Sequence, residues 1–293
     1  MYIRFEDIFM NQVQIKQEFK DFLLDTLGYA PDTILGDSTL HRIKDNKGKL
    51  NGAYVLHLDG VPAGYCQDFK QFIKSNWRSK GTYPKLTDEE RIKLKTEQRL
   101  QKQQRDIEEK QRHDKAMTKA LRVWSRATPV INHSYLTAKN IKPHNAKVYY
   151  GALVIPIFNN EVLVSVQFIG ENSHKDKRFL TGGKQSGSYA TLGQYNADKP
   201  ILICEGWATG ASLYEHTGNL TYMALSAHNI KAVAIYVRSL YPKGDIIIMG
   251  DNDSSGVGQR VAREAALVIN GKYLIPEIMG HDWNDSLNMG LIL

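Results

Sequence analysis

The sequence predicts an α/β protein whose C-terminal part holds a mostly parallel sheet flanked by helices. After Pro200, short apolar runs alternate with segments of helical periodicity, a pattern typical of βαβ units. Before Pro200, strand-like runs alternate with basic loops. A long charged stretch without Gly or Pro precedes these runs, and the N-terminal segment before that stretch combines helical and strand-like patterns. The expected parts are a small N-terminal α/β module (1–84), a long charged linker helix (85–126), a basic α+β subdomain (127–199) and the parallel-sheet domain (200–293).

Composition restricts the class of protein. The sequence contains no apolar run of the roughly 18 residues that a membrane span requires, and its N-terminus lacks the layout of a signal peptide, so we expect a cytoplasmic protein without a membrane partner. The two cysteines, Cys66 and Cys204, are too few and too far apart for a disulfide framework or a four-cysteine zinc site, so no zinc is expected. The 38 Lys and Arg residues outnumber the 31 Asp and Glu residues, which is compatible with a polyanionic partner.

The N-terminal module combines a helix with short strands. Apolar spacing over residues 1–27 predicts an amphipathic helix that ends at Gly28. The run 53–58 precedes Asp59-Gly60, a pair that favours a tight turn, and therefore predicts a hairpin.

Residues 87–126 predict one long helix, because the segment has no Gly or Pro and is rich in Glu, Lys, Arg and Gln. Thr87 and Glu90 have the spacing of a capping box. With 12 basic and 8 acidic residues, the helix is either a solvated spacer or a nucleic-acid contact face. An apolar stripe near its end predicts that the last turns dock on the following domain: Ala116, Met117, Ala120, Leu121 and Trp124.

A second hairpin is expected from the runs 152–158 and 162–169, and a basic stretch, 175–184, follows it. This stretch is either an ordinary basic loop or a surface for phosphates and stacked bases, in which Phe179 stacks on a base or lies in the core. It lacks the Walker A spacing. Its candidate nucleic-acid or nucleotide ligands are Lys177, Arg178, Phe179 and Lys184.

Carboxylates follow two strands of the predicted parallel sheet. Glu205 comes after the run 201–204, and Asp251 and Asp253 come after 245–249. Ligands gather at the carboxyl ends of parallel strands, and clustered carboxylates suit Mg²⁺ or Mn²⁺. The alternative is that one carboxylate caps a helix and the others are solvated. An EF-hand is excluded because its twelfth position is Ala262.

The motifs resemble those of the topoisomerase–primase (Toprim) family, in particular the Toprim primases of plasmids and phages. The resemblance rests on Glu205-Gly206-Trp207-Ala208-Thr209 and on Asp251-Asn252-Asp253. It also includes the segment 224–230, with His228 where the family has glycine, the segment 177–183, and the late run 281–285. The family's cysteine-rich zinc module is missing from this sequence.

The resemblance implies a DNA-dependent RNA primase of a mobile element, which makes short primers on single-stranded DNA from ribonucleoside triphosphates. A replicative helicase and a single-strand-binding protein are possible partners. The rival hypotheses are a Toprim nuclease or topoisomerase-like enzyme and a non-catalytic single-stranded-DNA-binding replication protein.

The resemblance also implies roles for single residues. Asp251 and Asp253 would hold Mg²⁺ or Mn²⁺ with help from Asp282 or Asp285, and Glu205 would bind metal or manage the proton of the 3′-hydroxyl. Arg260 and Arg263, on the helix that begins near residue 255, are either nucleotide ligands or solubilising surface residues.

Overall fold

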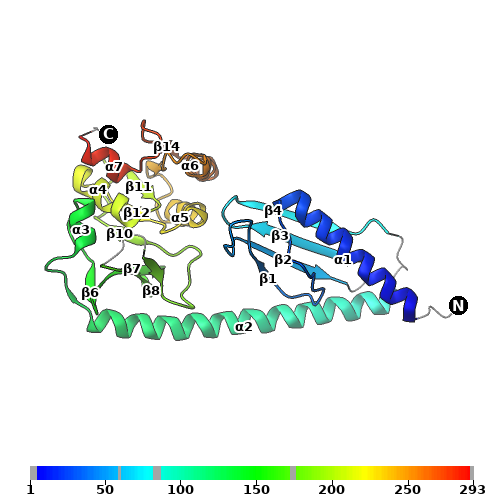
Figure 1. The fold of residues 1–293 in the computed structure, drawn as a ribbon. Coiled ribbons are helices and arrows are strands. Elements are labelled where there is room, and N and C mark those ends of the chain that lie inside the picture. The colour runs from blue at the N-terminus through cyan, green and yellow to red at the C-terminus, as the bar shows by residue number, and fades with distance from the viewer. Residues whose placement is uncertain (1–4, 59–60, 82–86, 172–175, 291–293) are drawn as a thin grey trace. The chain divides into compact units, whose positions relative to one another are not determined.

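The computed structural model describes residues 5–58, 61–81, 87–171 and 176–290. The chain divides into two compact units, 1–101 and 102–293 (Figure 1). Within the described ranges no helix is both long enough and apolar enough to cross a membrane.

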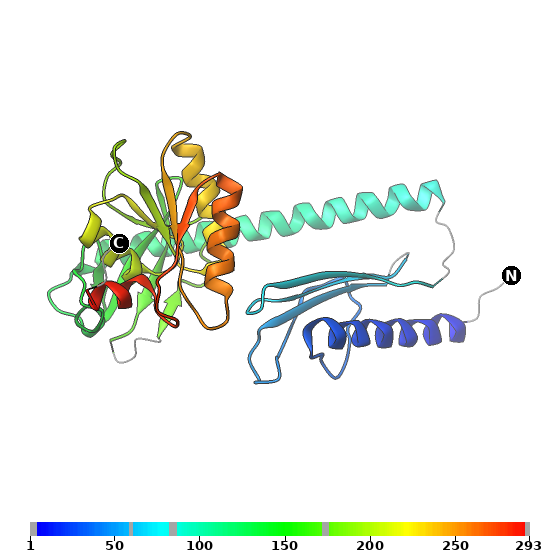
Figure 2. The same ribbon diagram turned by 90° about the horizontal axis from the view of Figure 1, so that it is seen from above.

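The first unit is a helix packed on a four-stranded antiparallel sheet (Figure 2). Helix α1 ends where the sequence predicts, because Gly28 takes a positive φ of 80° and its N–H caps the carbonyl of Leu24. The sheet order is β1-β2-β3-β4, and the predicted hairpin is β2 with β3, whose turn residues Asp59 and Gly60 lie outside the described residues. The elements are α1 (Phe5–Leu27), β1 (His41–Ile43), β2 (Gly52–His57), β3 (Ala63–Asp68) and β4 (Ile73–Arg78).

Phe19 joins the helix to this sheet. It is fully buried among Tyr54, Leu56 and Cys66, and its ring meets that of Trp77 at 5.3 Å between centroids. The close approach requires glycine at position 64, because a Cβ there would collide with the Phe19 ring.

The long predicted helix is α2 (Asp88–Arg126), and the Glu90 side chain of the expected capping box lies outside the described residues. Its last turns dock on the second unit as predicted. Ala116 and Ala120 are buried against strand residues Val154 and Val166, and Val123 joins them, whereas Leu121 is half exposed. Helical spacing therefore located the stripe, but its centre lies toward Val123 and away from Leu121.

The second unit contains two sheets. The first is antiparallel, in the order β5-β6-β7-β8-β9, and includes the predicted hairpin of β7 and β8. The turn of this hairpin places Asn160 and Glu161 at positive φ, as a two-residue hairpin turn of the primed type requires. The strands are β5 (Thr128–Pro129), β6 (Lys147–Tyr149), β7 (Ala152–Asn159), β8 (Val162–Ile169) and β9 (Lys177–Phe179), with α3 (Ser134–Lys139) between β5 and β6.

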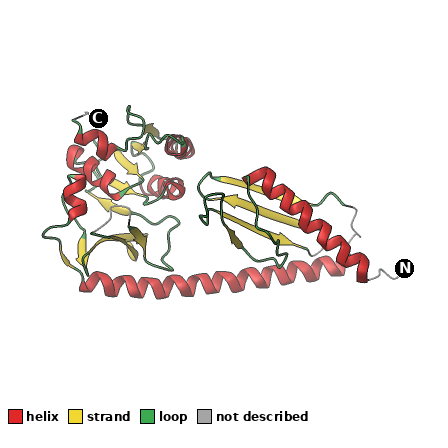
Figure 3. Ribbon diagram, in the orientation of Figure 1, coloured by secondary structure: helices red, strands yellow, loops and turns green. Residues whose placement is uncertain are grey.

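The second sheet is the predicted mostly parallel one, in the order β10-β12-β11-β13-β14. Strands β11 to β14 run parallel, and β10, which comes from before residue 200, joins β12 antiparallel. Helices α4 and α7 cover one face and α5 and α6 the other (Figure 3). The elements are β10 (Ala190–Leu192), β11 (Ile201–Cys204), α4 (Trp207–Thr217), β12 (Thr221–Met223), α5 (Ala227–Leu240), β13 (Ile246–Met249), α6 (Val257–Ile269), β14 (Lys272–Leu274) and α7 (Trp283–Asn288).

One hydrophobic core joins the two sheets. Leu153 and Ile155 of β7 pack in the same cluster as Trp207 of α4 and Trp283 of α7. The antiparallel sheet is therefore fixed against the parallel sheet, and side chains from its strands can reach the carboxyl edge of β11 and β13.

Candidate active site

The parallel strands bring the predicted carboxylates to one edge. Strands β11 and β13 are neighbours in register, with Cys204 opposite Met249. Glu205 follows the first directly, and Asp251 follows the second after Gly250. Both carboxylates therefore lie just beyond the carboxyl ends of the two central strands.

Asp251 is at the centre of this acidic cluster. Its burial raises its pKa, and so do the negative charges of four nearby carboxylates, so that the pKa reaches about 7. In order of effect these are Glu205, Asp282, Asp253 and Asp285. The Oδ1 atom of Asp251 is buried and has no hydrogen-bond partner among the described residues. A cation at this oxygen would relieve both the repulsion and the missing contact.

Glu205 is held by the start of helix α5. Its carboxylate accepts a hydrogen bond from the backbone N–H of Ala227. Burial raises the pKa of Glu205, and although this hydrogen bond and Lys177 lower it, the carboxylates of Asp253 and Asp282 contribute to a net upward shift. Glu205 is thus a stronger base than an ordinary glutamate.

Asp253 has a different environment, because it holds the start of helix α6. Its Oδ1 accepts hydrogen bonds from the N–H and hydroxyl of Ser255, at 2.9 and 2.5 Å, and its Oδ2 accepts one from the N–H of Gly258 at 2.7 Å. Burial would raise the pKa of Asp253, but these hydrogen bonds outweigh it, and the pKa is lowered. Asp253 is therefore an ionised carboxylate with fixed orientation, which also acts as a cap for the helix.

Asp282 and Asp285 form the capping box of α7. Asp282 Oδ1 accepts from the N–H of Asp285 at 2.9 Å, and Asp285 Oδ2 accepts from the N–H of Asp282 at 3.4 Å. Lys139 of α3 pairs with both, at 3.1 Å to Asp285 and 3.8 Å to Asp282. These two carboxylates thus have a structural role, and their charges reach Asp251 at the same time.

Lys177 brings a second cation to this edge from strand β9. Lys177 as a whole is exposed, but protein atoms around its amino group reduce hydration of the charge and lower the pKa. The positive charge of Lys139 lowers the pKa of Lys177 further. The carboxylates of Asp282, Glu205 and Asp251 act in the opposite direction. The site therefore combines a group of partly buried carboxylates with two lysines.

The geometry bears on whether a divalent cation fits. Among the described residues, no three carboxylate, imidazole or thiol groups are arranged to hold a metal ion by themselves. Mg²⁺ does not need such a cage, because it is usually bound by one or two carboxylates and completes its shell with water and substrate phosphates. The buried, unpartnered oxygen of Asp251, with further carboxylates close by, fits this mode of binding.

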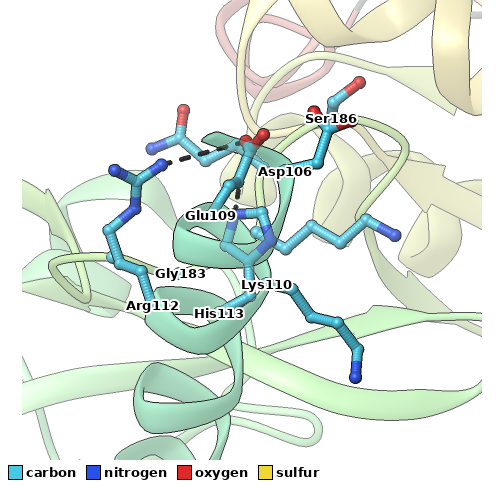
Figure 4. Close-up of a pocket in the computed structure, with 10 residues that line it drawn as sticks. Asp106, Glu109, Lys110, Arg112, His113, Gly183 and Ser186 are labelled. Atoms are coloured by element: carbon cyan, nitrogen blue, oxygen red, sulfur yellow. Dashed lines mark ion pairs between the residues drawn. The ribbon is translucent and has the colours of Figure 1, made fainter. Parts of the chain in front are cut away.

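The remaining candidates of the basic stretch lie elsewhere, and Lys175 is outside the described residues. Arg178 pairs with Asp176 at 2.9 Å on the surface, whereas Phe179 is partly buried and packs against the main core. Lys184 donates to Asn159 at 2.9 Å and lines a polar pocket (Figure 4). The other wall of that pocket is α2, with Asp106, Glu109, Lys110, Arg112 and His113.

Arg260 and Arg263 lie on the exposed side of α6. Arg260 pairs with Glu264, one turn further along the same helix, at 3.5 Å. This placement agrees with the surface interpretation at least as well as with nucleotide binding.

Sequence reasoning missed Lys139 and Gly258. A Cβ at position 258 would lie 2.5 Å from the carbonyl oxygen of Asp251 and 3.0 Å from Asp253 Oδ2, so only glycine fits beneath the two aspartates. The sequence signal was a glycine five residues after Asp253. No sequence signal pointed to Lys139, because the lysine is distant in sequence from both of its partners.

His228 stands where the family has glycine, but its backbone does not require glycine. His228 lies within α5, and the positive φ of this segment belongs to Leu225.

Comparisons with known proteins agree with this fold. Residues 200–292 match the Toprim domain. Two Escherichia coli proteins, both named DNA primase TraC, are 29% and 30% identical over 263 positions. Each match covers 82% of this chain, but the chain spans only 24% and 18% of the respective relatives.

Solved structures with similarity include a DNA primase domain from Pseudomonas aeruginosa, with a TM-score of 0.37 and 14% identity over 49% of this chain and 48% of that one. The zinc-binding and RNA polymerase domains of the Aquifex aeolicus primase give a TM-score of 0.45 and 13% identity over 94% of this chain and 81% of that one. From the domain match and the two relatives, the chain contains a Toprim domain and is homologous to DNA primase TraC.

Proposed function

We propose that the protein is a DNA-dependent RNA primase, a nucleotidyltransferase that makes short primers on single-stranded DNA in the replication or conjugation of a plasmid or phage. The observation that carries this proposal is Asp251, a buried carboxylate with an unpartnered oxygen among four further carboxylates, at the carboxyl edge of a Toprim sheet. Homology to DNA primase TraC supports the choice of reaction.

In this proposal Asp251 is the main ligand of Mg²⁺ or Mn²⁺, and Asp253 assists it through the remaining lone pairs of its fixed carboxylate. When bound, the cation would neutralise the triphosphate and stabilise the leaving pyrophosphate. Asp282 and Asp285 add negative charge from the start of α7, which increases the affinity of the edge for a divalent ion.

Glu205 and Lys177 act on the reacting groups. Because the pKa of Glu205 is raised, its carboxylate is suited to accept the proton of the attacking 3′-hydroxyl. Lys177 lies close enough to the carboxylates to be held at this edge, where its ammonium group would attract the triphosphate of the incoming ribonucleotide. Arg178 and Lys184 would contact template phosphates further from the reaction.

The proposed substrates are single-stranded DNA and ribonucleoside triphosphates, and the proposed partners are a replicative helicase and a single-strand-binding protein. A cytoplasmic location follows from that role. The bases of the template would be read by pairing with the incoming ribonucleotide, so the protein itself needs contacts mainly to the backbone and to base faces.

Asp251→Asn tests the proposal, with Asp245→Asn as a matched control. Asp245 immediately precedes β13, at the opposite end of the strand from Asp251, and forms an exposed ion pair with Lys272 at 2.9 Å. Both substitutions remove one negative charge beside the same strand. Only the change at position 251 should reduce the rate of primer synthesis, by 100-fold or more, since loss of a group that stabilises transition-state charge costs about 3 kcal/mol or more.

The readout is the formation of short RNA from labelled ribonucleotides on single-stranded DNA with Mg²⁺ or Mn²⁺. Synthesis by Asp251→Asn at the wild-type rate would overturn the assignment of the site. Metal-dependent cutting of the DNA without synthesis would assign the site to a nuclease, and equal binding by all three proteins with no reaction would favour a non-catalytic DNA-binding protein.

A further inference from the structure

We propose that a second surface of this protein, a pocket between α2 and the antiparallel sheet, holds one nucleotide of a single-stranded nucleic acid. The inference rests on the proposed function for the identity of the strand, which would be the DNA template. The pocket is lined by two cations and four aromatic residues, among others: Lys119, Arg178, Tyr149, Tyr150, Phe168 and Phe179. Among the described residues, no acidic side chain lines it.

Among these residues, Tyr150 gives the strongest support for a stacked nucleobase. The residue is 92% exposed, and its ring makes an edge-on contact with that of Tyr149, at 4.5 Å between centroids. It is the first of two turn residues between β6 and β7, and it takes a φ of 47°, a backbone conformation that is unfavourable for a bulky residue. A ring this exposed contributes little to packing, whereas a nucleobase could stack on its exposed face.

The two cations lie beside these rings on different elements. Lys119 is exposed on α2, and Arg178 is exposed on strand β9. Arg178 pairs with Asp176, but a surface pair of this kind contributes little, so a phosphate can compete for the guanidinium. Base stacking together with phosphate contact is the combination by which proteins bind single strands without regard to sequence.

The pocket continues along α2, which favours a strand over a free nucleotide. A second hollow shares Lys119 and Thr181 with it and adds Lys115 and Arg112. A third hollow, the one in Figure 4, shares Arg112 and Gly182 with the second and adds Lys110 and Lys184. Glu108 lines the second hollow, and Asp106 and Glu109 line the third, where Glu109 pairs with Arg112 at 3.8 Å on the surface. Cations outnumber these carboxylates in both hollows, so successive phosphates of a strand would meet a cation at each step.

The path also approaches the acidic cluster. β9 is the edge strand of its sheet, and its neighbouring residues Lys177 and Arg178 point to opposite faces. The negative charges of the carboxylates act on the pKa of Lys177, whereas Arg178 lines the pocket. A strand that passes over this short edge would contact the pocket on one side and the candidate active site on the other.

The test is the affinity of the full chain for a fluorescein-labelled 12-mer of deoxythymidine, measured by anisotropy in EDTA without ribonucleotides. Tyr150→Leu should weaken binding about 10-fold, since loss of one stacked base typically costs roughly 5- to 100-fold. Tyr150→Phe and Tyr150→Trp should bind like wild type, because they retain a ring. Tyr195→Leu, which removes a partly exposed tyrosine outside the pocket, serves as the control.

The salt dependence of binding tests the phosphate contact. Lys119→Gln should reduce the slope of log K against log salt by about 0.7, the contribution of one phosphate on a single strand. Lys102→Gln, an exposed lysine of the same helix that does not line the pocket, should leave the slope unchanged. Unfolding temperatures of the Tyr150, Lys119 and Lys102 variants should stay near that of wild type, because these side chains are exposed.

Wild-type affinity in Tyr150→Leu would overturn the inference, and so would an equal loss in Tyr150→Leu and Tyr150→Phe. Displacement of the 12-mer by the same nucleotide concentration of deoxythymidine monophosphate would assign the pocket to free nucleotides instead of a strand. Asp251→Asn should bind the 12-mer like wild type. Failure of primer synthesis would therefore leave this result standing, and failure here would leave the proposed reaction standing.

Discussion

Ionised Asp251 should destabilise the folded protein, and Asp251→Asn should remove that cost. The pKa of Asp251 is raised from 3.8 to about 7, so the folded state binds this proton more tightly than the unfolded state. Stability therefore falls as the pH rises from about 4 to about 7 and is lowest above 7. A rise in pKa of this size corresponds to about 4 kcal/mol of unfolding free energy, of which roughly 2 kcal/mol is lost between pH 5 and pH 7.

The assay is denaturant unfolding in EDTA at pH 5 and pH 8, followed by tryptophan fluorescence. Three of the four tryptophans, Trp124, Trp207 and Trp283, belong to the unit that contains Asp251. We expect wild type to lose about 3 kcal/mol relative to Asp251→Asn when the pH is raised from 5 to 8. Addition of Mg²⁺ at pH 8 should stabilise wild type more than the variant, because the variant lacks the main proposed ligand, ionised Asp251.

Asp245→Asn is again the control, and its stability difference from wild type should vary little between the two pH values, since Asp245 is exposed. A stability difference between wild type and Asp251→Asn that is the same at pH 5 and pH 8 would refute the reasoning. It would mean that the carboxylates do not act on Asp251 as their positions imply.

Three further predictions concern stability. Lys139→Met should cost about 1 kcal/mol, because it removes the cation that pairs with Asp282 and Asp285; thermal unfolding checks this, and an increase in stability would contradict it. Gly258→Ala should cost about 1–3 kcal/mol by denaturant unfolding, because its Cβ would meet the backbone of Asp251; a neutral effect would show that the loop can move. Phe19→Ala should cost about 3–5 kcal/mol in the first unit by hydrogen exchange and leave exchange in the second unit unchanged.

The sequence was sufficient for the parallel sheet and its acidic edge. Alternating strands and helices after Pro200 place Glu205 and Asp251 at carboxyl ends, and local periodicity decides this without knowledge of the rest of the fold. Strand β10 was not predicted, because a three-residue strand carries too little periodicity and its partner β12 lies about 30 residues away.

The environment of the site residues could not be read from the sequence. The hydrogen bonds that give Asp253 its low pKa and the burial that gives Asp251 its high one depend on where α6 and its neighbours pack. Lys139 reaches the cluster only because α3 packs near α7, a contact between residues more than 140 positions apart. Local sequence pattern therefore located the candidate carboxylates, and tertiary packing gave each of them a different environment.

Primer synthesis on single-stranded DNA of mixed sequence, with labelled ribonucleotides and either Mg²⁺ or EDTA, tests the central claim most directly. The account predicts short, alkali-sensitive products from wild type and Asp245→Asn in Mg²⁺, and none from Asp251→Asn or in EDTA. Products that form in EDTA, or that Asp251→Asn makes as fast as wild type, would contradict it.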